Sequence, residues 1–270
     1  MKRIKLIVAY DGTEYAGWQI QPNKETIEGV LNRELTRLLN EEIKVIGASR
    51  TDSGVHAEGA VCVFDTDSKI PGEKFSYALN QSLPEDIRIR KSEEVPLDFH
   101  PRKVPCRNTY RYSIWHDEFM KPTKCRYTHW IYTKLDIDAM EEACKYFVGK
   151  HDFKSLCSVH TDVENTERTI YDVHIEVVPE KSVLQSSGLI NNSVIQRKER
   201  GPQQIDIYVT GNGFLYNMVR IIAGTLIDVG QGRIQPGEIE GIIAGKQRQL
   251  AGQTAPAKGL TLVGYEWGRI

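Results

Sequence analysis

The densest group of polar and titratable side chains lies in the segment 47–56, GASRTDSGVH, which holds Arg50, Asp52 and His56. Such a group on a loop between two strands could be presented for chemistry by a rigid scaffold. In an arbitrary loop, however, Asp-Ser-Gly is most often a turn, in which aspartate accepts a backbone hydrogen bond and glycine supplies a positive φ. A Ser-His-Asp site built on Ser53 is weakly supported, because no G-x-S-x-G elbow is present and triad members are seldom this close in sequence.

Arg220 is the one cation of the otherwise apolar run 214–229. A buried guanidinium needs a carboxylate partner, because desolvating an unpaired charge is costly. Asp52 is a candidate for that partner. The alternative is an arginine at the helix edge that extends its charged end into water.

A basic and aromatic segment runs from Phe99 to Lys134. It contains eight lysines and arginines against two acids, although the whole chain has a net charge of −1. Six tyrosines and tryptophans are interleaved with these charges. Cations for phosphates and rings for bases suit RNA with exposed nucleotides. Packing of the rings inside a strand pair, with the charges outside, explains the composition equally well.

Other features of the sequence argue against a metal site, a bound nucleotide cofactor and a membrane-spanning segment. The seven histidines lack H-x-x-x-H spacing, the five cysteines lack C-x-x-C spacing, and neither a Walker A motif nor a complete dinucleotide fingerprint occurs. An odd number of cysteines favours reduced thiols and a cytoplasmic protein. No signal peptide and no run of about 18 apolar residues is present, so no membrane span is expected.

The elements that must position these residues follow from hydrophobic period and turn signals. The first part predicts strands at 3–10, 43–48, 60–66 and 86–95, with helices at 26–39 and 73–83. The second predicts strands at 107–115, 169–178, 204–210 and 260–267, with helices at 136–148, 214–229 and 238–245. The order β-α-β-β-α-β is typical of a split-βαβ fold. We therefore expect an α+β protein with two similar domains, 1–98 and 99–270, the second carrying a polar loop or insertion at 181–203.

Five segments resemble, in the expected order, the signatures of the tRNA pseudouridine synthase A (TruA) family. They are YDGTEYAGWQIQP at 10–22, SRTDSGVHA at 49–57, TYRY at 109–112, GFLYNMVR at 213–220 and TAPAKGL at 254–260. The resemblance implies two ferredoxin/RRM-like βαββαβ halves, whose antiparallel sheets abut around a central catalytic cleft. It also implies a homodimer that isomerises uridine to pseudouridine at positions 38, 39 and 40 of the tRNA anticodon stem-loop, with no cofactor and no metal.

The resemblance further implies roles for individual residues. Asp52 is expected to be the nucleophile, Arg220 to form an ion pair with it, and Arg50 to help hold the target nucleotide out of the helix. Tyr110 is expected to stack on the target uracil, and its hydroxyl is placed by analogy to assist proton loss from C5. His56 is expected to position the loop. Whether Asp52 attacks C1′ or supports a glycal route stays open.

Lys103, Arg107 and Arg111 are the residues expected to contact RNA. Two departures from the family pattern stand out: Asn108 replaces a frequent basic residue, and 181–203 matches no family segment. Two other functions stay open from the sequence. One is a non-catalytic RNA-binding protein with RRM-like halves, and the other is a hydrolase that uses Asp52, Ser53 and His56.

Overall fold

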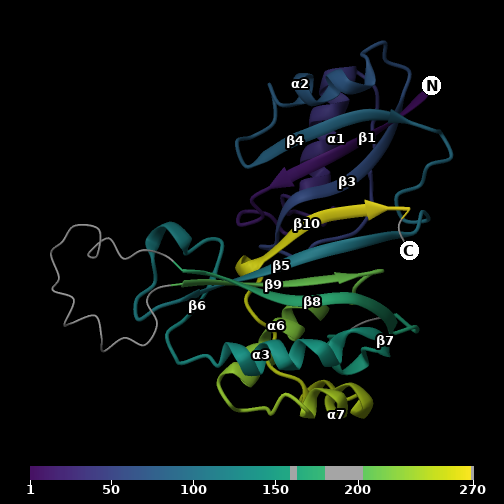
Figure 1. Cartoon of the computed structure of the whole chain (residues 1–270). Coiled ribbons are helices and arrows are strands. Elements are labelled where there is room, and N and C mark those ends of the chain that lie inside the picture. Colours follow the sequence, from purple (N-terminus) through teal and green to yellow (C-terminus); the bar gives the residue numbers. More distant parts are fainter. Residues whose placement is uncertain (159–162, 180–202, 269–270) are drawn as a thin grey trace, which may run out of the picture. The chain divides into compact units, whose positions relative to one another are not determined.

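A computed structural model describes residues 1–158, 163–179 and 203–268 of the chain (Figure 1). Helices and a mostly antiparallel set of strands alternate along it, which confirms the α+β class. The chain divides into two compact units: unit 1 is Met1–Tyr110 with Thr261–Ile270, and unit 2 is Arg111–Leu260. No helix within these described ranges is long and apolar enough to cross a membrane.

This division differs from the predicted one at residue 98 in two respects. Strand β5 (Cys106–His116) contributes residues to both units. The closing strand β10 (Leu260–Trp267) pairs in parallel with β3 of unit 1, with Thr261 opposite His56. Return of the last strand to the first unit is a non-local pairing, so composition and proline content could not reveal it.

Unit 1 is built from β1 (Lys2–Tyr10), α1 (Ile27–Leu39), β2 (Ile46–Gly47), β3 (His56–Thr66), α2 (Phe75–Leu79) and β4 (Ile87–Val95). Strand β1 pairs antiparallel with β3 on one side and with β4 on the other. Its alternate residues Ile4, Leu6 and Val8 are fully buried, as a half-buried strand requires. Helix α1 begins after Thr26, whose hydroxyl accepts from the Gly29 N–H at 3.2 Å.

Two predicted elements of unit 1 are shorter than expected. The strand predicted at 43–48 is reduced to Ile46–Gly47, because the N–H groups of Ile43 and Val45 donate to the side chains of Thr36 and Asn32 on α1. The helix predicted at 73–83 is a 3-10 turn followed by five residues of α2. Strand β3 begins at His56, four residues earlier than predicted.

Unit 2 contains most of β5, β6 (His129–Ile131), α3 (Ile137–Cys144), β7 (Gly149–Asp152), β8 (Glu167–Pro179), β9 (Gln203–Gly211), α6 (Met218–Gly230) and α7 (Glu238–Gly245). Strand β8 pairs antiparallel with β9, and Pro179 stands opposite Gln203. The polar loop or insertion predicted at 181–203 lies outside the described residues, except for Gln203, the first residue of β9. Helix α6 is buried along almost its whole length and contacts α3.

Candidate active site

Asp52 heads a tight turn between β2 and β3. The Val55 N–H donates to the Asp52 carbonyl at 3.1 Å, and Gly54 has a φ of +78°. A positive φ at the third position is typical of a type II turn, which favours glycine there. The turn interpretation of Asp-Ser-Gly is therefore confirmed, and this turn is also what presents the half-buried Asp52 side chain.

The turn rests on residues of the 10–22 segment through hydrogen bonds to its backbone. The carbonyl of Tyr15 accepts from the Gly54 N–H at 3.3 Å and from the Ser53 hydroxyl at 3.2 Å. The Trp18 N–H donates to the Thr51 carbonyl at 3.0 Å. Both sides of Asp52 are thus held by one segment of chain.

Two glycines allow this close approach of backbones. A Cβ at Gly12 would lie 2.0 Å from the Val55 carbonyl oxygen. A Cβ at Gly17, whose φ is +89°, would lie 2.5 Å from the Thr51 carbonyl oxygen. Neither distance is possible for a real side chain, so only glycine at these positions lets the segments 10–22 and 49–57 pack directly against each other.

His56 fixes the corner between β1 and the turn. Its side chain is buried, and its Nδ1 accepts from the Gly12 N–H at 3.1 Å. The Asp11 carboxylate lies 3.1 Å from the same nitrogen. These contacts hold the ring beside the turn, and the positioning role of His56 stays a prediction.

A cluster of hydroxyl groups surrounds the turn within unit 1. The Tyr10 hydroxyl bonds to the Thr51 hydroxyl at 2.8 Å, and both residues are buried. The Ser49 hydroxyl bonds to Tyr265 and to Tyr110. Tyr265, Ser49 and Tyr10 were not predicted as site residues. Ser49 stands in the quoted signature, but only the position of β10 in the fold reveals Tyr265.

Tyr110 and Asp52 are brought together in unit 1. Burial raises the pKa of Tyr110 to about 12, the Ser49 hydrogen bond opposes this, and the negative charge of Asp52 adds to it. The phenol is therefore protonated at neutral pH. Unassisted, Tyr110 can donate a hydrogen bond there but does not rest as a phenolate base.

The predicted RNA-contacting cations differ in their exposure. Arg50 and Lys103 are exposed, whereas Arg107 and Arg111 are half-buried. Along β5 the residues with odd numbers, Arg107 to Arg111, alternate with buried Asn108 and Tyr110. The cations therefore leave the opposite face of the strand from the Tyr110 ring.

Arg220 lies in unit 2, in the first turn of α6. Its Nε donates to the Ala255 carbonyl and its Nη1 to Asn217 Oδ1, both at 2.7 Å. The Ala255 N–H donates back to the Arg220 carbonyl at 3.1 Å. Asn217 has a φ of +61° and begins the helix, which is why α6 starts at Met218 rather than at residue 214. The guanidinium is thus oriented by two oxygens.

The segment that orients Arg220 is itself anchored to β5. The Tyr112 hydroxyl donates to the Pro256 carbonyl at 3.0 Å. A Cβ at Gly259 would lie 2.7 Å from the Tyr112 ring. The motifs at 109–112, 213–220 and 254–260 therefore meet around Arg220, as the first and second motifs meet around Asp52.

A model of the tRNA pseudouridine synthase family matches residues 6–102 and 143–267. The chain belongs to the tRNA pseudouridine synthase family. The tRNA pseudouridine synthase A of Ruminiclostridium cellulolyticum is 45% identical over 263 residues, covering 97% of this chain and 98% of that protein. The protein of the same name from Brevibacillus brevis is 43% identical over 264 residues, with the same coverage. The family resemblance is therefore confirmed.

The described part of the chain holds no candidate metal-binding cluster. No group of three or more His, Cys, Asp or Glu side chains there is placed to hold an ion. The groups around the Asp52 turn of unit 1 are a carboxylate, phenols, hydroxyls and the guanidinium of Arg50. This set suits nucleophilic or electrostatic catalysis by Asp52.

Proposed function

We propose that this chain isomerises uridine to pseudouridine at positions 38, 39 and 40 of the tRNA anticodon stem-loop, as a homodimer without a cofactor. The observation that carries the proposal is the Asp52 turn, held by the 10–22 segment beside the buried, protonated Tyr110. Membership of the tRNA pseudouridine synthase family supplies the reaction class.

The reaction exchanges one bond to the ribose for another. The C1′–N1 bond breaks and its electrons leave with the uracil ring. The ring then turns, C5 forms a bond to C1′, the C5 proton is lost and N1 gains a proton. Asp52 serves either as the nucleophile at C1′ or as the carboxylate that supports a glycal route. A rigid turn suits both roles, because a charge that is already oriented need not reorganise during the reaction.

Three further residues are assigned by the proposal. Arg220 forms an ion pair with Asp52, and its orientation by Ala255 and Asn217 prepares the guanidinium for that contact. Exposed Arg50 helps hold the flipped nucleotide, which offsets a few kcal/mol of unstacking. Tyr110 stacks on the uracil and its hydroxyl assists proton transfer at C5.

The proposal assigns this chain two RRM-like halves and a local basic surface for RNA. The order of strands and helices in unit 1 supports a half of that kind. Lys103, Arg107 and Arg111 contact backbone phosphates of the RNA. Because the net charge of the chain is only −1, affinity for RNA should come from this local patch and fall steeply with salt.

Tritium release from C5-labelled uridine in an anticodon stem-loop transcript tests the proposal. We expect release by the wild type and by Asp67→Ala, a control at an acid whose side chain is 77% exposed. Asp52→Ala should release none while keeping the circular dichroism spectrum and RNA binding of the wild type. Binding without release by the wild type would instead favour a non-catalytic RNA-binding protein.

Ser53→Ala separates the synthase from a hydrolase. The Ser53 hydroxyl donates its proton to the Tyr15 carbonyl at 3.2 Å, whereas a nucleophilic serine must deliver that proton to a base. We expect tritium release to be nearly unchanged in this variant. A complete loss, with the fold intact, would argue for chemistry at Ser53.

A further inference from the structure

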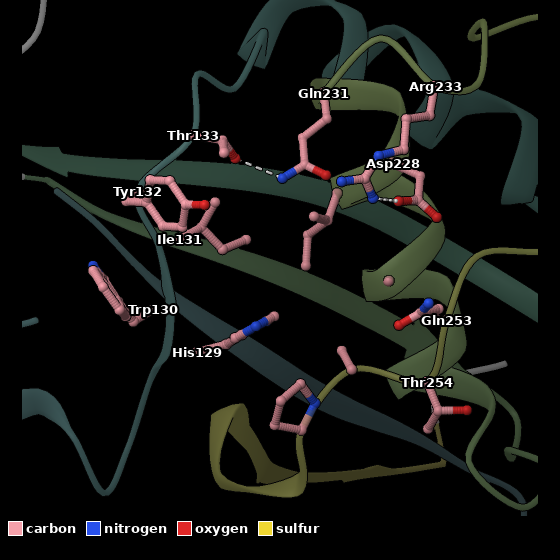
Figure 2. Close-up of a pocket in the computed structure, with 14 residues that line it drawn as sticks. His129, Trp130, Ile131, Tyr132, Thr133, Asp228, Gln231, Arg233, Gln253 and Thr254 are labelled. Carbon is pink, nitrogen blue, oxygen red and sulfur yellow. Dashed lines mark hydrogen bonds and ion pairs between the residues drawn. The ribbon is translucent and has the colours of Figure 1, made fainter. Parts of the chain in front are cut away.

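Unit 2 contains a pocket of about 410 Å³ that has no role in the proposed reaction. One wall is β6 with the residues that follow it, and the other is α6 with the segment 253–256 (Figure 2). This volume falls within the range of pockets that bind small ligands.

The first wall carries two aromatic rings. Trp130 and Tyr132 lie with their ring centroids 5.6 Å apart and tilted by 42°. They are 38% and 68% exposed, respectively. The indole is nevertheless held, because its Nε1 donates to the Asp117 carbonyl at 3.0 Å. Exposed rings in a fixed orientation are typical of surfaces on which nucleobases stack.

The opposite wall carries amide and charged groups (Figure 2). Gln231 donates to the Thr133 hydroxyl at 2.6 Å, and its Oε1 is buried without a hydrogen-bond partner among the described residues. An unsatisfied buried acceptor is unusual and invites a donor from a ligand after a small rotation of the amide. Arg233 pairs with Asp228 at 2.6 Å at the rim and remains 65% exposed.

The pocket also adjoins the residues that orient Arg220. Ala255 and Pro256 line it, and their carbonyls accept from Arg220 and Tyr112. In addition, β6 belongs to the segment 99–134, where cations exceed acids by six. The aromatic pair therefore lies in the part of the sequence best suited to a polyanion.

We propose that this pocket binds an unpaired nucleobase of the tRNA, stacked on Trp130 and Tyr132, with its phosphate near Arg233. The identity of the RNA rests on the proposed function. A second copy of the chain is the competing occupant, but a concave site that combines two exposed rings with an amide and an exposed guanidinium fits a nucleotide better. Protein interfaces are depleted of charge at their centres.

Fluorescence anisotropy with a labelled tRNA transcript tests this site. We expect the double variant W130A/Y132A to weaken binding by about 10- to 100-fold, the range for losing one base–aromatic stack. W130F/Y132F keeps both rings and should bind much more tightly than the alanine pair. Tyr77→Ala is the matched control, because Tyr77 is also 68% exposed but lies on α2 of unit 1.

The outcomes separate this proposal from the reaction itself. If the wild type releases tritium and W130A/Y132A binds tRNA normally, the pocket proposal is wrong and the reaction stands. If the wild type binds tRNA without release and the double variant binds more weakly, the pocket stands and the reaction fails. A lower molar mass of W130A/Y132A by light scattering would show that the rings join two copies, which overturns the nucleobase site.

Discussion

The buried bond between the Tyr10 and Thr51 hydroxyls provides a quantitative test of how the Asp52 turn is held. The two oxygens lie 2.8 Å apart, and the residues are only 5% and 8% exposed. Tyr10→Phe removes one partner and leaves the other buried. Such an orphaned hydroxyl costs about 1–3 kcal/mol, which corresponds to a fall in Tm of about 2–4 °C for each kcal/mol.

Thr51→Val should destabilise the protein by a similar amount, because it orphans the Tyr10 hydroxyl. The double variant replaces both partners with apolar groups of nearly the same shape, which is close to neutral in other proteins. We therefore expect the double variant to lose less stability than the sum of the single variants, by about 1 kcal/mol or more. Since Thr51 directly precedes Asp52, each single variant should also lower kcat, by up to about 100-fold.

Thermal unfolding of the four proteins, with tritium release at saturating RNA, measures both effects. Fluorescence and circular dichroism should give the same order of Tm values. Strict additivity of the two substitutions would show that the hydroxyls do not stabilise one another. The bond would then have no part in holding the turn.

Three other substitutions test separate parts of the site. Gly17→Ala should lower the free energy of unfolding by at least about 2 kcal/mol and abolish activity, because the φ of Gly17 is +89° and a Cβ there would lie 2.5 Å from the Thr51 carbonyl oxygen. Gly264→Ala is the control, because a Cβ at Gly264 would lie in open space. A wild-type Tm for Gly17→Ala would contradict this prediction. Arg220→Ala should lower the free energy of unfolding by about 1.5–3 kcal/mol, because two hydrogen bonds from a charged group are lost, and Tm and turnover should fall with it. Unchanged Tm and turnover would refute this prediction. Tyr110→Phe should reduce kcat strongly if the hydroxyl transfers a proton and hardly at all if the ring only stacks. Because folding raises the pKa of Tyr110 from 10 to about 12, the protonated phenol contributes its full stabilisation of the folded state below pH 10, and this contribution is lost as the pH rises through 12. Denaturant titrations between these pH values should therefore show a smaller fall in the free energy of unfolding for Tyr110→Phe than for the wild type.

The elements with a strong hydrophobic period could be predicted from the sequence. Strand β1 alternates buried and partly exposed residues, and α1 carries its N-cap at Thr26, so both lie within one residue of the predicted ends. The strand predicted at 43–48 failed for a tertiary reason, since side chains of α1 take the N–H groups that a strand partner would need. Strand β7, Gly149–Asp152, has no apolar alternation at all, and only its pairing with β8 defines it.

The types of residue at the site were predictable, but most of their neighbours were not. Asp52 and Tyr110 are both members of recognisable motifs, and the structure brings them together. Tyr265 reaches Ser49 from the closing strand, because β10 returns to pair beside β3. Such a return depends on the order of strands in the sheet, which local periodicity does not encode. The ion pair between Asp52 and Arg220 stays a prediction.

The 10–22 motif shows why a family signature is not a set of catalytic residues. Its glycines leave room for the Val55 and Thr51 carbonyls, and its backbone groups bond to the turn that carries Asp52. Substitutions there should therefore lower activity by displacing a carboxylate, without removing any reacting group. Loss of kcat should then follow loss of stability in these variants, whereas Asp52→Ala should lose far more activity than its loss of stability explains. This difference, more than the size of any single loss, identifies which residues perform the chemistry.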